Sequence, residues 1–385
     1  MWGLIKQKLK NWGHWSFAMY GRLRYGWWYR KLTIVAVTGT DGKSSTVLLS
    51  AHLLRSLGFT VAHYSSISYH DGLMELPNNT KMTTPGKARL HRFLAQAYYN
   101  GATHAVVEIT SEGILQHRHR GIQFDVVAFT NITPEHIERH GSFEAYLDAK
   151  LSLMKARKRK GVVVWNVADA TLQAVYSRFV QDVAVPVAVP LTGVEGADIF
   201  RTRNDFFARA IIEDGLGIPV GEATTALCNI PGRFEIFRGS TTVIVDYAHT
   251  LAAVELSLKQ ARQLTNGRVI HVFGAAGGGR DRYKRPLLAK LSEKYSDVHI
   301  ITEENSFDEP VEQIMNEIGS GFSQFTTVYR FSKREDAVKY ALSLARPEDM
   351  VLCTAKGSEM VIAGPKRTMR PYNEREFVKT CLAQK

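Results

Sequence analysis

Residues 39–44, Gly-Thr-Asp-Gly-Lys-Ser, constrain the fold of this chain more than any other part of the sequence. They follow an apolar run typical of a β-strand, at 32–37, and precede a helical pattern at 46–57 that ends at a glycine. Glycines in such a turn let backbone N–H groups approach phosphate oxygens, and the helix start adds the positive end of its dipole. Lys43 would bring a cation to the β- and γ-phosphates, and Ser44 would offer a hydroxyl to Mg²⁺. The pattern therefore predicts an ATP-binding site between a strand and a helix.

Apolar runs alternate with helical patterns along most of the chain. This alternation predicts an α/β fold in which helices cover both faces of a parallel sheet. A less regular stretch at 185–232 ends in Asn-Ile-Pro-Gly, which predicts a linker between two α/β domains near residue 231. The expected strands cover residues 32–37, 61–64, 104–109, 124–130 and 161–165 in the first domain, and 242–245, 268–273, 298–302, 327–329 and 350–354 in the second.

The composition, 45% hydrophobic and 22% charged, is that of an ordinary globular protein, and 385 residues suffice for two or three domains. Three widely spaced cysteines without a Cys-x-x-Cys pair argue against a disulfide framework or zinc site and fit a reducing cytoplasm. No apolar run is long enough to predict a transmembrane helix. The net charge of +12 indicates anionic partners. Nucleic acid is one interpretation, but a nucleotide-phosphate substrate is more economical, and we expect no nucleic acid partner.

The N-terminal segment has an unusual composition. Residues 1–33 carry seven Lys or Arg and no acidic residue, and residues 1–31 hold five of the six tryptophans. Tryptophan together with lysine and arginine is typical of a segment that lies at a membrane surface. The alternative is an arm whose aromatic side chains pack on the protein itself. Peripheral membrane contact through residues 1–31 is therefore a hypothesis.

A series of short motifs runs through the chain. They are 39–44 (GTDGKS), 83–85 (TTP), 108–112 (EITSE), 130–131 (TN) with His136 and 140–141 (HG), 149–150 (AK), 232–235 (GRFE), 246–250 (DYAHT), 278–281 (GGRD) with 284–286 (KRP), and 356–359 (KGSE). In this order and spacing they resemble the Mur ligase family, in particular the members that add the third amino acid to UDP-N-acetylmuramoyl-dipeptide. The resemblance implies a basic aromatic arm at 1–32, a central parallel-sheet P-loop ATPase domain at 33–230 and a Rossmann-like α/β domain at 231–385.

The resemblance also implies an ATP-dependent ligase of cytoplasmic cell-wall synthesis. Such enzymes phosphorylate a carboxylate of a small-molecule acceptor, and the amine of an amino acid then attacks the acyl phosphate to form an amide. Phosphoryl transfer requires placement and neutralisation of charge, for which Lys43 and Mg²⁺ are suited. Ser44 and Glu108 offer the oxygen ligands that Mg²⁺ prefers, and Glu108 ends an apolar strand where ligands gather in α/β sheets. The resemblance places His136 close to a second Mg²⁺.

Lys150 is the most specific prediction of the set. In similar ligases the matching lysine, in the context His-Gly…Ala-Lys, reacts with CO₂ and becomes a carbamate (N6-carboxylysine). The modification turns a cation into an anion that can hold Mg²⁺ or orient the γ-phosphate. Burial would favour the neutral amine that this reaction needs. The alternative is an ordinary exposed lysine on a helix.

The resemblance assigns further residues to ATP and to the two other substrates. Those for ATP are Gly39, Thr40, Asp41, Gly42, Lys43, Ser44, Ser45, Asn131, Arg233, Asp246 and His249. Those for the acceptor and the amino acid are Thr83, Thr84, Thr110, Arg118, Arg280, Asp281, Asn305, Gly357 and Glu359. Arg118 could hold a D-glutamyl carboxylate through a bidentate contact.

Three departures from the family pattern concern substrate choice. Relatives carry an N-terminal domain that grips the UDP moiety, whereas only the aromatic arm precedes the phosphate loop here, so UDP is held elsewhere or the acceptor is not a UDP-sugar. Relatives that select diaminopimelate read Asp-Asn-Pro-Arg where this chain reads Glu-Asn-Ser-Phe at 304–307, and Phe307 cannot pair with a carboxylate. A family asparagine three residues past Asn204 is replaced by Phe207.

Other functions remain open at this point. A folylpolyglutamate synthetase or another poly-amino-acid ligase would use the same chemistry. A non-catalytic nucleotide-binding scaffold would have no need for Lys43, Glu108, His136, Lys150 and Asp246 together. An ATPase stimulated by nucleic acid would explain the net charge but not the context of Lys150.

Overall fold

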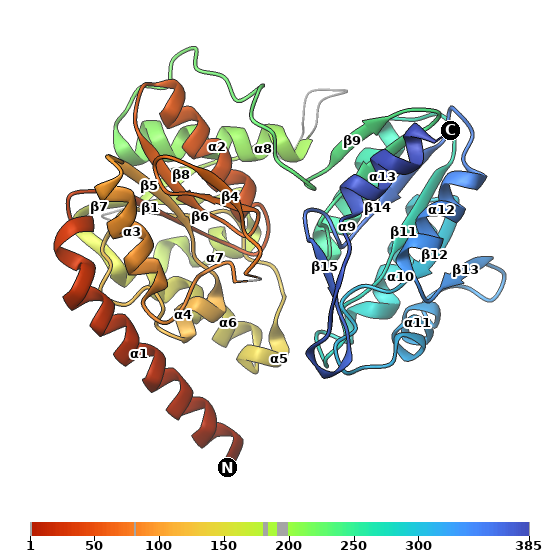
Figure 1. The fold of residues 1–385 in the computed structure, drawn as a ribbon, viewed down its shortest axis with the longest axis horizontal. Coiled ribbons are helices and arrows are strands. Elements are labelled where there is room, and N and C mark those ends of the chain that lie inside the picture. The colour runs from red at the N-terminus through yellow and green to blue at the C-terminus, as the bar shows by residue number, and fades with distance from the viewer. Residues whose placement is uncertain (1, 81, 180–183, 191–198, 385) are drawn as a thin grey trace. The chain divides into compact units, whose positions relative to one another are not determined.

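The computed structural model describes residues 2–80, 82–179, 184–190 and 199–384, and it places side chains in these ranges apart from 2–12, 177–179 and 184. The chain divides into two compact units, with the boundary between Asn229 and Ile230. Both units are α/β, as the alternation of apolar runs predicts, and Figure 1 shows a sheet flanked by helices in each. None of the helices in the described part of the chain combines the length and hydropathy needed to span a bilayer.

The first unit is built on an eight-stranded sheet with the order β4-β3-β2-β5-β1-β6-β7-β8. Its strands from β2 to β8 in this order run parallel, and the β3–β4 hairpin adds antiparallel strands at one edge. The strands are β1 (Thr33–Thr38), β2 (Val61–Tyr64), β3 (Ser68–His70), β4 (Glu75–Pro77), β5 (His104–Glu108), β6 (Phe124–Phe129), β7 (Arg157–Asn166) and β8 (Ala184–Val187).

Helices cover both faces of this sheet. One face packs against α3, α6, α7 and the end of α1 in a core that contains Ile34 and Trp165, and the other face packs against α2 and α8. The helices are α1 (Trp2–Tyr29), α2 (Lys43–Ser56), α3 (Arg89–Tyr99), α4 (Ser111–Leu115), α5 (Ile137–His140), α6 (Phe143–Leu151), α7 (Ala170–Phe179) and α8 (Ile199–Ala210), with a 3₁₀ turn η1 (Ser152–Ala156) and a π turn η2 (Ile211–Gly215).

The register of the central strands positions the candidate site. Val37 of β1 lies opposite Glu108 of β5. The phosphate loop leaves β1 after Thr38, and the Glu108 carboxylate therefore stands beside it at the carboxyl edge of the sheet. The buried hydrophobic residues of β1 and β5 hold both in place.

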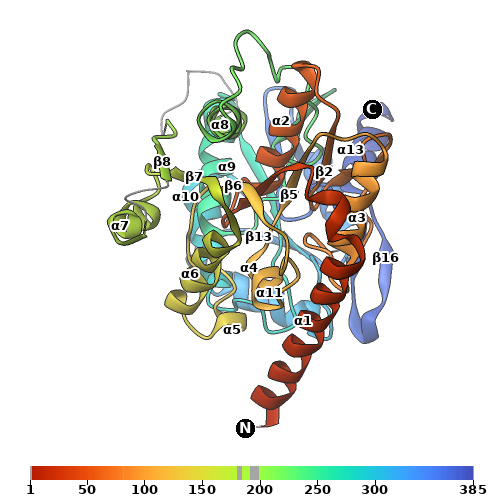
Figure 2. The ribbon, with the colours of Figure 1, turned by 90° about the vertical axis from the view of Figure 1, so that its left-hand side faces the viewer.

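The N-terminal segment is one long helix, α1, that packs on α3. The two helices lie side by side in both views (Figures 1 and 2), and the N-terminal half of α1 extends beyond the other elements of the first unit. The side chains of Trp2, Trp12 and the three lysines at 6, 8 and 10 lie outside the described ones. One face of α1 thus packs on the protein, as the interpretation of this segment as a packed arm expects.

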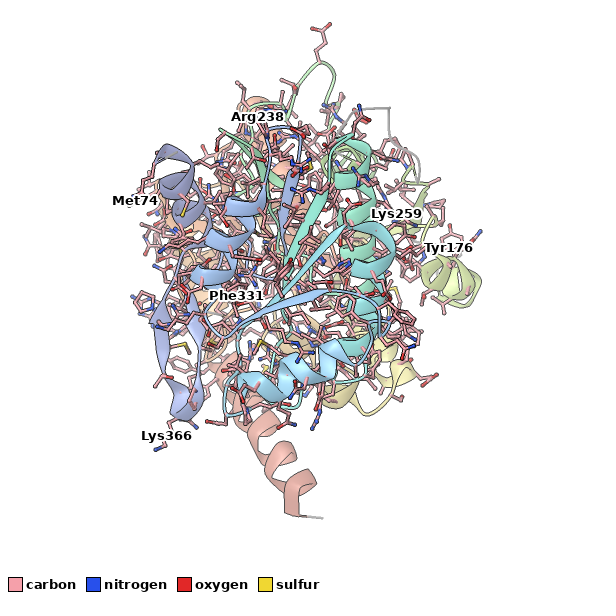
Figure 3. All side chains as sticks on the ribbon, turned by 90° about the vertical axis from the view of Figure 1, so that its right-hand side faces the viewer. Met74, Tyr176, Arg238, Lys259, Phe331 and Lys366 are labelled. Carbon is pink, nitrogen blue, oxygen red and sulfur yellow. The ribbon has the colours of Figure 1, made fainter. Side chains whose placement is uncertain are left out.

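The second unit has a six-stranded sheet with the order β13-β12-β11-β14-β10-β9, parallel except for β9. Helices α12 and α13 cover one face and α9, α10 and α11 the other. A separate β15–β16 ribbon carries Lys366 at its tip, pointing away from the protein (Figure 3). The strands are β9 (Glu235–Arg238), β10 (Thr242–Val245), β11 (Val269–Phe273), β12 (Val298–Thr302), β13 (Val328–Phe331), β14 (Met350–Cys353), β15 (Val361–Ala363) and β16 (Met369–Pro371). The helices are α9 (Leu251–Gln263), α10 (Lys284–Tyr295), α11 (Val311–Gly319), α12 (Arg334–Leu344), a 3₁₀ turn η3 (Pro365–Arg367) and α13 (Glu374–Ala383).

Three local expectations differ from the structure. Helix α2 begins at Lys43 rather than at residue 46, because the left-handed Gly42 ends the loop directly before it. Strand β7 begins at Arg157 rather than at 161, because backbone pairing with Phe124 and the ion pair of Lys158 with Asp125 extend it. The stretch at 185–232 holds a regular helix, α8, that packs on α2; residues 191–198 lie outside the described ones.

Candidate nucleotide and metal site

The phosphate loop has a backbone that only glycine suits at two positions. Gly39 has φ +151° and Gly42 has φ +78°. A Cβ at Gly39 would lie 1.8 Å from Thr130 Oγ1, and a Cβ at Gly42 would lie 2.6 Å from Asn204 Oδ1. Gly42 is also the N-cap residue of α2 and gives that helix no side-chain cap. The first N–H groups of α2 are therefore available to an anion, as phosphate binding requires.

The loop is tied to the segment that follows β6. The backbone N–H of Thr40 donates to Asn131 O (2.9 Å), and that of Asp41 donates to Asn131 Oδ1 (2.8 Å). The Thr130 hydroxyl donates to Asp41 O (2.7 Å), and the Thr40 hydroxyl lies 2.8 Å from the Tyr146 hydroxyl. Asn131, predicted as an ATP contact, thus shapes the loop through its side chain and its backbone.

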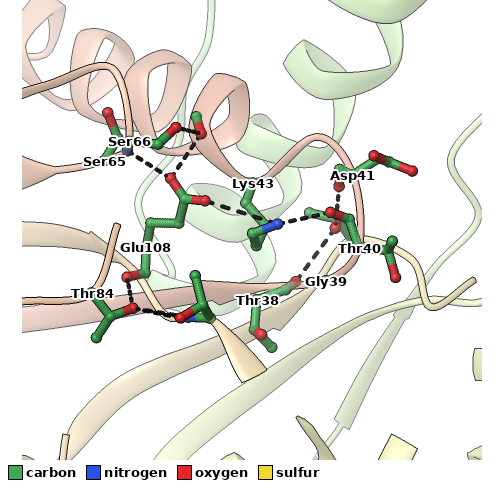
Figure 4. A network of polar contacts seen from close by, with 12 residues as sticks. Thr38, Gly39, Thr40, Asp41, Lys43, Ser65, Ser66, Thr84 and Glu108 are labelled. Atoms are coloured by element: carbon green, nitrogen blue, oxygen red, sulfur yellow. Dashed lines mark hydrogen bonds and ion pairs between the residues drawn. The ribbon is translucent and has the colours of Figure 1, made fainter. Parts of the chain in front are cut away.

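Glu108 gathers the polar groups around the loop. Its Oε2 accepts a hydrogen bond from Ser44 Oγ (2.7 Å) and another from the backbone N–H of Ser66 (3.0 Å). Its Oε1 lies 3.9 Å from Lys43 Nζ, which also donates to Thr40 O (2.7 Å). Figure 4 shows Lys43 reaching between the carboxylate and the loop. The buried carboxylate is therefore paired by charge and by hydrogen bonds.

This donor set fits Mg²⁺ and a triphosphate. A buried carboxylate and a hydroxyl oxygen lie in contact with each other, which is the oxygen chemistry that a hard cation prefers. An ammonium group and an uncapped helix start lie directly beside them. Ser45, the other predicted ATP contact in this helix, is buried in the first turn of α2.

Lys150 lies fully inside the first unit, on the last turn of α6. Its Nζ donates to Gly39 O (2.5 Å) and lies 4.8 Å from the centre of the Tyr146 ring. Burial lowers the pKa of the Lys150 ammonium well below its ordinary value, and the positive charge of Lys43 lowers it further. The position is thus unlike the exposed helix lysine that was the alternative, and it favours the neutral, nucleophilic amine.

The two histidines near α5 play different parts. His136 precedes the helix with φ +56° and is half-buried. Its assignment to a second Mg²⁺ stays a prediction. His140 ends the helix, and its Nε2 lies 3.2 Å from Ser111 Oγ while its ring packs edge-on against Tyr146. Burial lowers the pKa of His140.

The residues predicted for the acceptor lie close together beside Glu108. The Thr84 hydroxyl donates to Glu108 O (3.0 Å) and accepts from the backbone N–H of Thr110 (2.9 Å). Arg118 donates to Thr84 O (2.6 Å), and its remaining N–H groups donate to Gln116 Oε1 (2.6 and 3.0 Å). Thr84 is fully buried, whereas Thr83 beside it is half-buried. Thr84 thus also supports the β5–α4 turn, a structural task that the sequence did not predict.

In the second unit, Asp246 follows β10 and is buried. Its Oδ1 accepts from the backbone N–H of Phe234 (3.2 Å), and its Oδ2 accepts from Ser257 Oγ (2.5 Å). Burial raises the pKa of this carboxyl, although Ser257 and Arg233 oppose the rise. The Arg233 guanidinium lies 4.3 Å from the centre of the Tyr247 ring. His249 donates from Nδ1 to Tyr247 O (2.8 Å). The ATP contacts assigned to Arg233, Asp246 and His249 stay predictions.

A second polar cluster in this unit joins two of the predicted substrate residues, Asn305 and Glu359. Asn305 Nδ2 donates to Glu359 Oε2 (2.8 Å), and Lys356 Nζ donates to the same oxygen (2.5 Å). Burial raises the pKa of the neighbouring Glu304, while Lys356 lowers it. Gly357 has φ +49°, and a Cβ there would lie 2.6 Å from the carbonyl oxygen of Gly232.

Arg280 and Asp281 lie on the loop after β11. The Arg280 guanidinium lies 4.7 Å from the centre of the Phe307 ring, so the residue that replaces a family arginine stacks against another arginine. Asp281 is buried with φ +32°, and its Oδ2 lies 3.9 Å from Lys284 Nζ.

The sequence did not predict the contacts that three residues make in the first site. Ser66 bridges Glu108 and Ser44, yet nothing in its surroundings marks it. Asn204 lies against Gly42, so an asparagine does reach the phosphate loop, three residues before the position that Phe207 occupies. Tyr146 contacts both Thr40 and Lys150. The spacing of Tyr146 and Lys150, four residues on one helix, was a signal that could have found it.

Comparisons with known proteins identify the family of this chain. A family model described as the Mur ligase middle domain matches residues 37–200, and one described as the Mur ligase, glutamate ligase domain matches residues 232–357. A UDP-N-acetylmuramoyl-L-alanyl-D-glutamate–2,6-diaminopimelate ligase of Aquifex aeolicus is 32% identical over 386 residues, covering 91% of this chain and 78% of that protein. A UDP-N-acetylmuramyl-tripeptide synthetase of Deinococcus radiodurans is 31% identical over 396 residues, covering 92% and 79%.

Solved structures share the fold. A Mycobacterium tuberculosis folylpolyglutamate synthase complexed with ADP aligns with a TM-score of 0.69 at 17% identity, covering 91% of this chain and 95% of that chain. At this identity the likeness concerns the fold alone.

Proposed function

Because the chain belongs to the Mur ligase family, whose members are ATP-dependent amide-bond ligases, we propose that it joins an amino acid to a muramoyl-peptide-like acceptor. The acceptor carboxylate attacks the γ-phosphorus of ATP, which gives an acyl phosphate and ADP. The amine of the amino acid attacks the acyl carbon, phosphate leaves, and the amine loses a proton. The observation that carries the proposal is the contact of Glu108 with Ser44 and Lys43 beside the uncapped start of α2.

We assign the catalytic tasks of the first unit to four residues. Lys43 neutralises charge on the β- and γ-phosphates, and the N–H groups that start α2 bind the same oxygens. Ser44 and Glu108 would hold Mg²⁺, with His136 at a second ion. When bound, Mg²⁺ supplies positive charge that lowers the repulsion between the two anionic substrates.

Lys150 is the fourth residue, and we propose that it carries a carbamate. The neutral amine attacks the carbon of CO₂, one N–H proton leaves to water, and the side chain gains a carboxylate. The buried position and the lowered pKa of Lys150 support this modification, because both favour the unprotonated amine. The nearby ammonium of Lys43 would then attract the new charge.

The second unit would bind the amino acid and complete the nucleotide contacts. Asn305, Gly357 and Glu359 form the proposed amino-acid site, together with the loop of Arg280 and Asp281. Phe307 offers a stacking partner to Arg280 and no charge to a distal carboxylate. Of the two relatives named above, one is named for 2,6-diaminopimelate and the other names no amino acid, so we assign no particular amino acid to this chain.

The test is phosphate release from ATP with a panel of acceptors and amino acids. Release that requires both an acceptor and an amine supports a ligase. Release with a folate acceptor would instead support the folylpolyglutamate reaction, which is the second candidate because a folylpolyglutamate synthase shares the fold. Lys150→Ala should abolish release, while Lys155→Ala, five residues along the chain, serves as the matched control. Full activity of Lys150→Ala would remove the carbamate from the mechanism. Release driven by DNA or RNA alone would overturn the proposal.

We also propose that the enzyme touches a membrane peripherally through residues 1–31. The composition of this segment, basic and rich in tryptophan without an acidic residue, supports the contact. A cytoplasmic location stays a prediction.

A further inference from the structure

Helix α1 presents two very different faces. The face toward α3 is closely packed: Ala18 and Tyr29 are each only 2% exposed, and a Cβ at Gly21 would lie 2.8 Å from the His91 ring. The Tyr29 hydroxyl lies 2.9 Å from His91 Nδ1 across the same contact. This face therefore fixes the C-terminal half of α1 on the first unit.

The opposite face exposes large apolar side chains. Tyr20, Leu23 and Trp27 are 57%, 83% and 70% exposed. Their spacing of three and then four residues places them in one line along the helix. Apolar residues recur upstream in the sequence at the same three- and four-residue spacing, at Trp2, Ile5, Leu9 and Trp12, with the polar Ser16 between them and Tyr20. The exposed apolar side chains of Tyr20, Leu23 and Trp27 mark an interaction surface.

Basic side chains lie beside this line and at its end. At about 100° per residue, Arg24 lies on one side of the line through Leu23 and Trp27, and Arg30 follows the last residue of the helix; both are exposed. The basic residues at the start of β7 lie near the end of the helix, because Lys158 Nζ contacts Leu32 O (3.4 Å). The surface therefore combines apolar groups with positive charge, and helix α1 contains no acidic residue.

We propose that this face of α1 binds the surface of an anionic lipid bilayer. The inference rests on the proposed peripheral contact and specifies its face and its lipid chemistry. Tryptophan and tyrosine rings suit the boundary between headgroups and acyl chains, and flanking arginines reach anionic headgroups. A second copy of this chain is a poorer partner, because the seven Lys or Arg of residues 1–33 in one copy would face the same seven in the other and repel them.

Binding by this face would also restrain the active site. Helix α1 ends at Tyr29, and β1 begins at Thr33 and leads directly to the phosphate loop at Gly39. Because α1 is packed on α3, the helix and the loop belong to the same compact unit. The nucleotide site would therefore keep a fixed orientation to the bilayer.

Co-sedimentation of the full chain with vesicles tests the proposal. Vesicles of phosphatidylcholine with phosphatidylglycerol should bind the protein at least about tenfold more strongly than phosphatidylcholine alone, and added salt should weaken binding. Leu23→Gln with Trp27→Gln should reduce binding at least about tenfold by removing apolar groups that enter the interface. The matched control is Leu227→Gln with Phe325→Gln, which replaces two apolar residues that are 88% and 87% exposed elsewhere.

A second pair tests the charge. Arg24→Glu with Arg30→Glu should lower the affinity for anionic vesicles more than tenfold, since each Lys or Arg near an anionic surface raises that affinity about fivefold. Lys290→Glu with Lys366→Glu makes the same change of net charge on exposed positions of the second unit and should matter much less. Amino-acid-dependent phosphate release without vesicles should be unchanged in both α1 pairs, which separates this surface from the ligase reaction.

Each of the following outcomes would refute a particular part of this proposal. Wild-type protein that binds no vesicle refutes the peripheral contact itself. Wild-type binding that neither α1 pair reduces places the contact elsewhere and refutes this face. Equal binding to both vesicle types refutes the anionic partner. A dimer by light scattering that the Leu23 and Trp27 pair converts to monomer, without vesicle binding, assigns the face to self-association instead.

Discussion

Two buried histidines beneath α1 should make the first unit sensitive to acid. Burial lowers the pKa of His91 from 6.5 to about 4. Burial also lowers the pKa of His119 to about 4, with further contributions from His117, Arg120 and His91. Both histidines are therefore neutral in the folded protein at pH 5, whereas they are protonated in the unfolded chain.

The sign and size of the effect follow from these values. Between pH 6.5 and about 4 the unfolded chain binds more protons than the folded one, so the free energy of unfolding falls as the pH falls. The full shift of about 2.5 units corresponds to about 3.4 kcal/mol for each histidine, of which about 2 kcal/mol is lost between pH 7 and pH 5. Against a typical stability of about 5–15 kcal/mol, the pair is a large contribution.

Urea unfolding followed by tryptophan fluorescence measures this loss. All six tryptophans lie at or before Trp165, so the signal reports on the first unit alone. Other histidines with lowered pKa values, such as His63 and His104, add their own acid dependence. The comparison is therefore between wild type and the variant His91→Gln with His119→Gln. The variant should lose about 4 kcal/mol less between pH 7 and pH 5. An equal loss in both proteins would refute the assignment of the acid sensitivity to these two groups.

Three further substitutions test individual contacts. Glu108→Gln should weaken Mg²⁺-dependent nucleotide binding about 10- to 100-fold, measured by calorimetry, because it removes the charge of a proposed ligand. Unchanged Mg²⁺ dependence would contradict that role. Tyr146→Phe should lower the free energy of unfolding by about 1 kcal/mol and raise the KM for ATP through the lost contact with Thr40, and an unchanged KM would limit the hydroxyl to a structural part. Arg334→Met should destabilise the second unit by about 3–5 kcal/mol in chemical denaturation, because it leaves the buried Glu374 carboxylate unpaired. A change below about 1 kcal/mol would mean that water or another cation reaches Glu374.

The sequence predicts most strands of this fold because their signals are local. The runs at 61–64, 242–245 and 298–302 are strands with the same bounds in the structure. Each is a short, mostly apolar run, and burial on both faces of a parallel sheet requires little else. The α/β fold is confirmed for this reason.

Local signals fail where tertiary contacts decide the structure. The basic residues 157–160 do not resemble a strand, yet pairing with β6 and the contact of Lys158 with Asp125 make them the start of β7. Helix α8 lies in the stretch that the sequence did not assign to a helix or strand, and it packs on α2. Propensity is a weak guide in both cases because neighbours distant in sequence supply the stabilisation.

In the candidate site, too, local sequence signals could be predicted and tertiary contacts could not. The phosphate loop could be predicted because glycine, lysine and serine are contiguous and each has a separate physical task. Ser66 and Asn204 could not, because their places follow from how the β2–β3 turn and α8 pack against the loop. Thr84 was predicted as a substrate contact, and its burial and backbone bonds became visible only in three dimensions.

Lys150 illustrates how one environment can disfavour a cation and favour an anion. Burial and the neighbouring Lys43 lower the pKa of the amine, whereas Asp41 and Glu108 oppose the change. In the proposed carbamate the signs would reverse: the ammonium of Lys43 would attract the carbamate, and the two carboxylates would repel it. A divalent cation held by Glu108 would offset this repulsion with its positive charge, so the proposed modification and Mg²⁺ binding should stabilise each other. Removal of CO₂ should therefore weaken Mg²⁺ binding in the wild type and leave it unchanged in Lys150→Ala. Equal weakening in both proteins would show that CO₂ acts at another group.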